Sequence, residues 1–202
     1  ALDALPRLLT MAAGQTAGLV NISELASPFQ ISRQTIRDYL TLLTRIFLVD
    51  ELPPWFNNRL KRLVKTPKLH LSDTGLAGAL LGLNADSLWT DRPLFGRLLE
   101  TFVFQELRRH ASWHDATVTF NHYRDKDQAE VDIVLESEAR ICGVEVKASS
   151  TVTGDDFRGL RRLAEAAGAK FAAGVVLYDG EAIVRFGDRL FAVPVSQLWS
   201  GS

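Results

Sequence analysis

The chain has 202 residues, enough for one or two domains that each bury a core. Its 47% hydrophobic and 23% charged residues are ordinary for a globular protein, and its formal net charge of −1 excludes a global basic field. Any affinity for nucleic acid must therefore come from a local patch. No apolar run approaches the roughly 20 residues that span a bilayer, so we expect no membrane partner.

The start of the chain and its cysteine content bear on its context. It begins Ala-Leu-Asp without an initiator methionine, and we expect a C-terminal portion of a longer protein, although N-terminal processing would leave the same trace. No basic-then-apolar leader is recognised there. The single cysteine, Cys142, cannot form an internal disulfide. These features predict a cytoplasmic protein.

The first segments predict three helices. Leu5 to Ala17 carries apolar residues at helical spacing. Asn21 or Ser23 is expected to cap a short second helix, and Ser32 a third helix that runs to about residue 47. The apolar stripe of the third helix is Ile36, Tyr39, Leu40, Leu43 and Phe47. Three helices with a short turn before the third predict a helix-turn-helix.

A strand-loop-strand follows the third helix. Leu48–Leu52 and Lys68–Leu71 are strand-like, and Pro53-Pro54 breaks the pattern between them. This arrangement predicts the wing of a winged helix. Between Glu51 and Asp73 the chain has no acid but carries five cations: Arg59, Lys61, Arg62, Lys65 and Lys68. Asp73 then starts a short helix that ends near residue 82.

Two sets of residues are candidates for nucleic-acid contact. The third helix opens with the side chains that a recognition helix would present to a major groove, namely Arg33, Gln34, Thr35 and Arg37. The wing adds Arg59, Lys61, Arg62 and Lys65. Two alternatives stay open, because winged helices also bind proteins and the wing cations could be solvated or contact a neighbouring domain.

The second half of the chain has a different order of predicted helices and strands. A strong amphipathic helix is expected at about Leu94–Arg109 and a second helix at about Asp155–Ala167. Strands are expected near residues 118–123, 130–136, 141–147, 171–178, 182–186 and 190–193. We place the domain boundary within residues 83–91, which gives domains 1–83 and 84–202. The fold class expected for the whole chain is α/β (α+β).

Two of these strands carry the polar residues that point to chemistry. Side chains alternate along a strand, so Glu145 and Lys147 must share one face. Asp132 lies on the preceding strand, and it falls opposite Glu145 if the connecting turn centres near residues 138–139. Two carboxylates can hold a hard divalent cation, and a lysine beside them can position or deprotonate a water. The preceding helix offers a third acid, because Glu100 lies at the edge of its apolar arc and Glu106 within it.

The order of these motifs resembles a known superfamily. A helix acid, then Asp132, then Glu145-Val146-Lys147 in an αβββαβ order is similar to the PD-(D/E)xK nucleases. A longer match resembles the uncharacterised C-terminal region that follows an AAA+-type ATPase domain in many prokaryotic proteins. It covers nearly the whole chain and rests on the helix-turn-helix, the basic wing, Leu71-Ser72-Asp73-Thr74-Gly75-Leu76, Gly96-Arg97-Leu98-Leu99-Glu100, Tyr123-Arg124, Glu130-Val131-Asp132 and Val144-Glu145-Val146-Lys147.

The resemblance implies roles for residues. Asp132, Glu145 and Glu100 would bind Mg²⁺, for which Mn²⁺ could substitute, and Lys147 would assist the attacking water. The four would form the catalytic set of an endonuclease or exonuclease acting on DNA. One departure is Glu130, two before Asp132, where the superfamily often has a small residue or proline.

The resemblance also implies partners, and it leaves an alternative. The partners would be DNA and an N-terminal ATPase domain of the same protein, and a homo-oligomer stays open. ATP would belong to that absent domain alone, because the chain has no Gly-x-x-x-x-Gly-Lys-Ser/Thr loop. The superfamily includes members that keep the scaffold without catalysis. The alternative function is therefore an inactive module that binds DNA or protein and is coupled to the ATPase.

Overall fold

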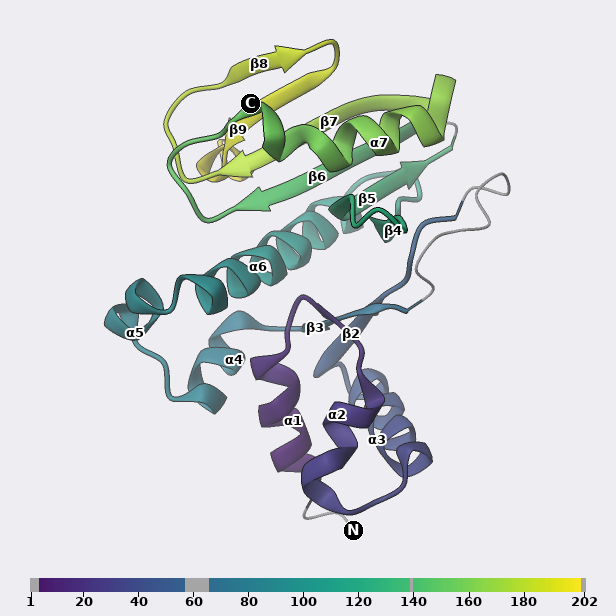
Figure 1. Cartoon of the computed structure of the whole chain (residues 1–202), viewed down its shortest axis with the longest axis vertical. Helices are drawn as coiled ribbons and strands as arrows, with labels where there is room; N and C mark the ends of the chain where they lie inside the picture. The colour runs from purple at the N-terminus through teal and green to yellow at the C-terminus, as the bar shows by residue number, and fades with distance from the viewer. Residues whose placement is uncertain (1–3, 57–65, 139, 201–202) are drawn as a thin grey trace. The chain divides into compact units, whose positions relative to one another are not determined.

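The chain forms a mixed α/β structure, as the sequence predicts, with its contacts gathered in two compact units (Figure 1). The computed structural model describes residues 4–56, 66–138 and 140–200. The first unit is Ala1–Leu52 with Thr66–Phe102, and the second is Pro53–Lys65 with Val103–Ser202. In the part of the chain so described, no helix is both long enough and apolar enough to cross a membrane.

Two helices of the first unit, α2 and α3, begin at predicted caps. The Asn21 side chain accepts a hydrogen bond from the Glu24 N–H, and the Ser32 hydroxyl accepts one from the Thr35 N–H at 3.0 Å. Each bond satisfies a backbone donor that the first turn leaves unpaired. The helices are α1 (Ala4–Gly14), α2 (Ile22–Ala26) and α3 (Arg33–Arg45), with a 3-10 turn, η1 (Ser27–Phe29), after α2.

A small antiparallel sheet completes this part of the first unit. Its strands are β1 (Gly18–Leu19), β2 (Val49–Leu52) and β3 (Lys68–Leu71), in the order β1-β3-β2. The two strands expected on either side of the wing are confirmed, and they pair from Val49↔Leu71 to Leu52↔Lys68. The two-residue β1 is absent from the sequence predictions because it is too short to show an alternating pattern.

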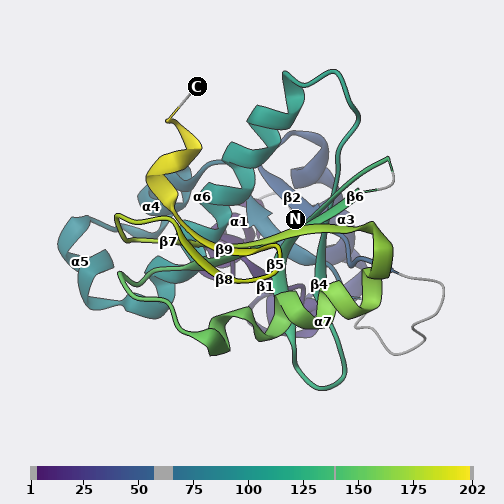
Figure 2. The same cartoon turned by 90° about the horizontal axis from the view of Figure 1, so that it is seen from above.

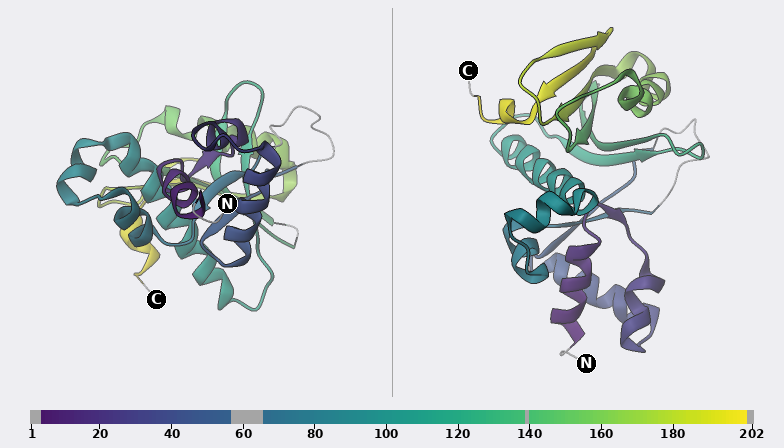
Figure 3. Two further views of the ribbon diagram at one scale, coloured as in Figure 1. Left: turned by 90° about the horizontal axis from the view of Figure 1, so that it is seen from below. Right: turned by 60° about the vertical axis from the view of Figure 1, so that its left-hand side comes forward.

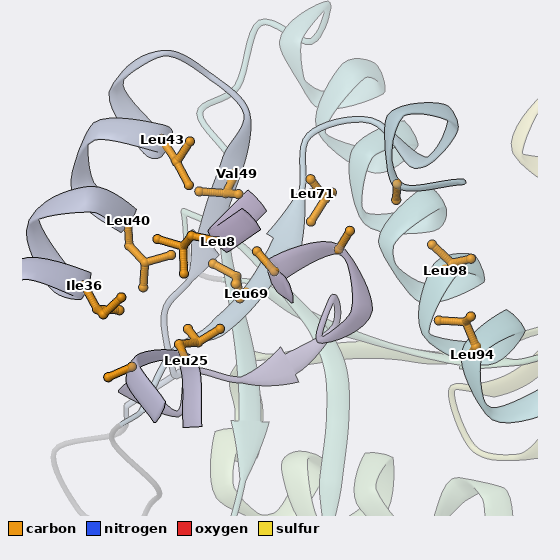
Figure 4. Packing of buried hydrophobic residues seen from close by; sticks show 14 residues of the cluster. Leu8, Leu25, Ile36, Leu40, Leu43, Val49, Leu69, Leu71, Leu94 and Leu98 are labelled. Carbon is orange, nitrogen blue, oxygen red and sulfur yellow. The ribbon is translucent and has the colours of Figure 1, made fainter. Parts of the chain in front are cut away.

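Leucines from helices and strands fill the core of the first unit (Figure 4). Phe47, expected in the apolar stripe of α3, is instead 82% exposed. The reason is local, because α3 ends at Arg45 and Phe47 has a left-handed backbone with φ of 60°. The largest buried contributors are Leu8, Leu25, Ile36, Leu40, Leu43, Val49, Leu69, Leu71, Leu94 and Leu98.

Three further helices follow β3. Asp73 caps the first of them by accepting a hydrogen bond from the Leu76 N–H, and Gly82 ends it in a left-handed conformation. The helices are α4 (Thr74–Leu81), α5 (Ala85–Thr90) and α6 (Arg92–Ser112). The first turns of α6 place Leu94 and Leu98 in the core of the first unit. The contacts therefore divide the chain within α6, between Phe102 and Val103.

A six-stranded mixed sheet dominates the second unit (Figure 2). The strand order is β4-β5-β6-β7-β9-β8; β4, β5 and β6 pair antiparallel, β7 runs parallel to both β6 and β9, and β8 is antiparallel to β9. The strands are β4 (Thr119–Arg124), β5 (Glu130–Ser137), β6 (Arg140–Lys147), β7 (Phe171–Tyr178), β8 (Val184–Gly187) and β9 (Leu190–Pro194).

One helix packs on a face of this sheet, as the right-hand view of Figure 3 shows. It is α7 (Arg158–Ala167), preceded by the 3-10 turn η2 (Gly154–Phe157). Phe157 of η2 and Leu160 and Leu163 of α7 itself are fully buried. The approach is close because the facing residues are glycines. A Cβ at Gly159 would lie 1.7 Å from the Glu130 carbonyl oxygen, and one at Gly143 would lie 2.6 Å from Leu160.

The chain that leaves β2 is built into the second unit. The Trp55 N–H donates to the His122 carbonyl at 2.7 Å, and the His122 N–H donates to the Pro53 carbonyl at 2.9 Å. Trp55 is buried against Tyr123. These contacts cover the edge of the sheet at β4, an edge that would otherwise expose unpaired backbone groups. The first residues of the expected wing are therefore hydrogen-bonded to β4, through an isolated bridge at Pro54, and do not form a free loop.

Candidate functional site

The β5–β6 hairpin has the register that the sequence argument required. The strands pair from Ser137↔Arg140 to Ile133↔Val144, and the same register continued would set Asp132 opposite Glu145. Asp132 lies one residue beyond the last pair. Its carboxylate oxygen Oδ2 accepts a hydrogen bond from the Val146 N–H at 2.9 Å. The side chain thus supplies an acceptor to β6 where the backbone pairing stops.

A β-bulge explains this position of Asp132. On the other side of β5, Asn121 pairs with Val134 and Tyr123 pairs with Val131, so β5 has one residue more than β4 in this interval. The extra residue falls within Asp132–Ile133. Bulges bend a strand and redirect side chains, and they are frequent beside active sites.

Lys147 and Glu145 point to the side of the sheet that α7 covers. Gly143 faces Leu160 of α7, and residues two and four positions later share its face. The Lys147 ammonium lies 3.2 Å from Glu145 Oε1 and 3.8 Å from Asp156 Oδ1. The structure therefore brings three predicted residues, Asp132, Glu145 and Lys147, to one end of β5 and β6.

Asp156 is a residue of this cluster that the sequence argument missed. It lies in η2, where its oxygen Oδ2 accepts hydrogen bonds from the Thr153 N–H at 2.8 Å and the Thr153 hydroxyl at 3.0 Å. The sequence does carry a signal, because Thr153 followed three residues later by an acid is the pattern of a capping box. The cap leaves Oδ1 facing Lys147.

The cluster is partly open to solvent and rich in carboxylates. Asp132 is 8% exposed, whereas the side chain of Lys147 is 35% exposed. Burial lowers the pKa of Lys147, but the carboxylates of Glu145, Asp132 and Asp156 outweigh that effect, and the net shift of its pKa is upward. Lys147 is accordingly a cation that faces three acids.

Glu100, the fourth predicted catalytic residue, lies in the first unit and pairs there with Lys68. The Lys68 ammonium is 2.8 Å from Glu100 Oε1, and the Lys68 side chain is 3% exposed. A buried cation needs such a partner. Lys68 therefore has a structural role in place of the solvent-facing one that a basic wing suggested. The second helix acid, Glu106, belongs to the second unit, where it accepts a hydrogen bond from Trp199 and pairs with Arg109.

The chemistry of the donors fits magnesium, although the number of ligands is small. Among the described residues no group of three or more His, Cys, Asp or Glu side chains is arranged to hold a metal ion. Mg²⁺ prefers oxygen ligands, and often takes only one or two carboxylates while keeping several waters. Asp132 and Glu145 can supply that pair. The ammonium of Lys147 against Glu145 already places positive charge where a cation would be held.

The candidate residues for nucleic-acid contact are described only in part. Arg33 and Arg37 are exposed at the start of α3. Gln34 donates to Asp38 along the same helix, and the Thr35 hydroxyl hydrogen-bonds with Ser32. The wing residues Arg59, Lys61, Arg62 and Lys65 lie outside the described residues.

A mainly apolar cavity of about 390 Å³ lies at the opposite, hairpin end of β5 and β6. Its lining includes Leu107 and His110 of α6 with Leu135 and Cys142 of the sheet. Burial raises the pKa of the Cys142 thiol, so the thiol is a weak nucleophile. None of Asp132, Glu145, Lys147 and Asp156 lines this cavity, and the acidic cluster is therefore a separate feature.

Comparison with known proteins gives two family matches. A family described as "Domain of unknown function (DUF8612)" matches residues 1–87, and one described as "Domain of unknown function (DUF4143)" matches residues 95–198. The interval between the matches overlaps the boundary region 83–91 expected from the sequence.

Similar curated proteins come from mycobacteria. Uncharacterized protein Mb2031c of Mycobacterium bovis and uncharacterized protein Rv2008c of Mycobacterium tuberculosis are each 34% identical to the chain over 194 residues. The alignment covers 95% of the chain but 42% of each relative, so the chain spans less than half the length of these proteins. Because the match to residues 95–198 takes in more than half of the sequence, the chain belongs to the DUF4143 family.

Proposed function

We propose that the second unit is a nuclease-like domain whose acidic cluster binds Mg²⁺ and hydrolyses phosphodiester bonds. One observation carries the proposal: Asp132, Glu145 and Lys147 meet at one end of β5 and β6, with Lys147 3.2 Å from Glu145. The helix, three strands, helix and strand from α6 to β7 support it, since this is the αβββαβ order of the PD-(D/E)xK nucleases.

Each residue has a role that its geometry permits. Asp132 and Glu145 would hold the ion, which supplies a Lewis acid and a more acidic bound water. The Val146 N–H fixes the Asp132 carboxylate through its oxygen Oδ2. Lys147, as an ammonium, would donate a hydrogen bond to the attacking water or to a phosphoryl oxygen. The bulge in β5 keeps Asp132 beside β6.

Cleavage assays test this proposal. Supercoiled plasmid and single-stranded DNA are incubated with the chain and Mg²⁺ or Mn²⁺, and the wild type is compared with Asp132→Ala and Lys147→Ala. We expect metal-dependent cleavage that each substitution lowers by at least about 100-fold, as loss of a group acting in the transition state does. Cleavage that survives both substitutions would come from a contaminant and would count against the proposal.

A second candidate is a catalytically silent module that binds DNA or protein, and one observation favours it. Glu100, which the superfamily pattern assigns to the metal, is paired with the buried Lys68 at 2.8 Å. A site that uses only Asp132 and Glu145 has one carboxylate fewer than the pattern implies. Absence of cleavage by the longer natural protein, with ATP and Mg²⁺ present, would select this candidate over the nuclease.

The first unit is proposed to be a winged helix that contacts DNA through the start of α3. Helices α1, α2 and α3 with the sheet β1-β3-β2 support it, as do the exposed Arg33 and Arg37. Filter binding over a salt series tests it. Loss of one phosphate contact should reduce the slope of log K against log salt by about 1, so Arg33→Gln or Arg37→Gln should do so. The wing cations Lys61, Arg62 and Lys65 can be tested in the same way, and an unchanged slope in every variant would reject DNA contact.

The remainder of the longer relatives is proposed to hold an AAA+-type ATPase domain, as the resemblance implies. The nuclease-like unit would then be its DNA-associated C-terminal region. ATP hydrolysis by the full-length protein, compared with this chain alone, tests that assignment. Equal or absent activity in the two would reject it.

A further inference from the structure

We propose that Asp156 is a positioning residue that receives the Lys147 ammonium when a divalent cation binds Glu145. The inference rests on the proposed metal site and adds a residue to it. Lys147 is held between Glu145 Oε1 at 3.2 Å and Asp156 Oδ1 at 3.8 Å. The shorter contact is with the carboxylate that the cation requires.

The two cations compete for one carboxylate. An ammonium and a divalent ion on the same oxygen repel each other strongly in a partly buried site, so binding of the ion must displace Lys147 from Glu145. Displacement into water would leave the lysine mobile and away from the reacting groups. A second carboxylate within reach provides a new partner instead, and Asp156 is already at ion-pair distance.

Asp156 is built to serve as that partner. Its oxygen Oδ2 is fixed by two hydrogen bonds from Thr153, whereas Oδ1 faces Lys147. The next residue, Phe157, is fully buried, which anchors η2 against the sheet. Asp156 therefore has one fixed orientation, and a pre-positioned charge loses little entropy when it accepts an ion pair.

Direct metal binding is a different role that Asp156 could play, and the two roles make opposite predictions. A metal ligand contributes to affinity whether or not Lys147 is present. A positioning residue contributes only through Lys147, because its effect is to stabilise the displaced ammonium. A double-mutant cycle separates these cases, since a residue that acts through another shows no effect once the other is removed.

The experiment measures Mg²⁺ affinity of the whole chain by isothermal titration calorimetry, without DNA. We expect Asp156→Asn to weaken Mg²⁺ binding about 10-fold, within the range for residues that support a metal ligand. Lys147→Met, which keeps the apolar stem, should bind Mg²⁺ more tightly than wild type because the competing ammonium is gone. Adding Asp156→Asn to Lys147→Met should then leave the Mg²⁺ affinity unchanged.

Matched variants control for charge and folding. Asp155→Asn removes an adjacent, exposed acid and changes the net charge equally, and we expect it to bind as wild type does. Asparagine at 156 retains an oxygen for the Thr153 cap, and an unchanged thermal unfolding curve verifies the fold. Asp156→Glu should restore part of the affinity.

Three results would overturn the inference in distinguishable ways. A tenfold loss of Mg²⁺ affinity when Asp156→Asn is added to Lys147→Met would mean that Asp156 binds the metal directly or acts only through its negative charge. If Asp156→Asn and Asp155→Asn bind Mg²⁺ with equal affinity, Asp156 has no positioning role, although the proposed metal site itself is not rejected. No Mg²⁺ binding by the wild type rejects the proposed metal site itself, and the inference falls with it.

Discussion

The two units each pair a lysine with a glutamate, but the surroundings of the two pairs differ. In the first unit, Lys68 pairs with Glu100 and both side chains are largely withdrawn from water. In the second unit, Lys147 is shared by Glu145 and Asp156, with Asp132 nearby, and more than a third of its side chain is open to solvent. The first pair is nearly closed to solvent, whereas the second lysine faces three acids.

The neighbours of each pair extend this contrast. Beside Lys68–Glu100, the His70 ring hydrogen-bonds with Thr101, and Thr101 hydrogen-bonds with Thr16, in a network of buried residues. We call this the closed cluster. The second, which we call the open cluster, has an excess of acids that a divalent cation would neutralise. Balanced and buried charge is typical of a structural network, whereas an unbalanced group of acids is typical of a site that binds or reacts.

The largest effect is expected from breaking the closed cluster. Lys68→Met removes the ammonium that pairs with Glu100, and loss of one partner of a buried pair costs about 3–5 kcal/mol. Urea unfolding of the chain followed by circular dichroism measures this cost. Adding Glu100→Gln should recover much of it, because the carboxylate charge that Lys68 balanced is then removed. A cost below about 1 kcal/mol for Lys68→Met, which is typical of an exposed pair, would contradict the structural role of the closed cluster.

The open cluster depends in turn on how closely α7 approaches β5. Gly159→Ala would place a methyl group 1.7 Å from the Glu130 carbonyl oxygen, so the helix or the strand must move. Overpacking of this kind costs about 1–3 kcal/mol, and the movement should also weaken the proposed binding of Mg²⁺ because Asp132 follows Glu130 by two residues. Gly154→Ala is the control, since its methyl group would meet only the end of Arg161 at 4.0 Å. Equal unfolding midpoints for the two variants would show that α7 has room to adjust.

The open cluster was more accessible to sequence reasoning than the closed one, for physical reasons. Alternation along a strand places Glu145 and Lys147 together whatever the rest of the fold does, and a short hairpin connects Asp132 to them. The helix caps at Ser32 and Asp73 are also local, because each side chain bonds the N–H of the residue three positions later. The pairing of Lys68 with Glu100 joins residues that are 32 positions apart, and no local pattern encodes such a contact.

Two details of the open cluster also escaped prediction. The bulge at Asp132 follows from the mismatch between β4 and β5, which depends on how two strands settle against each other and not on either sequence alone. Asp156 precedes a helix, and an acid there is normally explained by capping. Its second role appears only when β6 brings Lys147 within 3.8 Å.

Alkaline pH offers a way to weaken the second unit through Tyr123. Burial is the main cause that raises the pKa of Tyr123 from 10.0 to about 12, aided by the nearby Asp125. Because the folded state disfavours the phenolate, the stabilisation is complete below pH 10 and is lost as the pH rises from 10 toward 12. At pH 11 the loss is about 1.4 kcal/mol. The difference in unfolding free energy between pH 9 and pH 11 should shrink by that amount in Tyr123→Phe. An unchanged difference would mean that the phenol ionises as freely in the folded chain as in the unfolded one.

The smallest effect tests the contrast most directly, because one chemical change is made in both clusters. Asp132→Asn keeps an acceptor for the Val146 N–H and removes one of several crowded acids, so the free energy of unfolding should change by no more than about 0.5 kcal/mol, or rise. Glu100→Gln instead removes the carboxylate that pairs with the buried Lys68 ammonium and should lower stability by several times that amount. A side chain that serves function without stabilising the fold can be replaced without lowering the free energy of unfolding. If Asp132→Asn were as destabilising as Glu100→Gln, the open cluster would be a second structural network, and its acids would no longer support the proposed metal site.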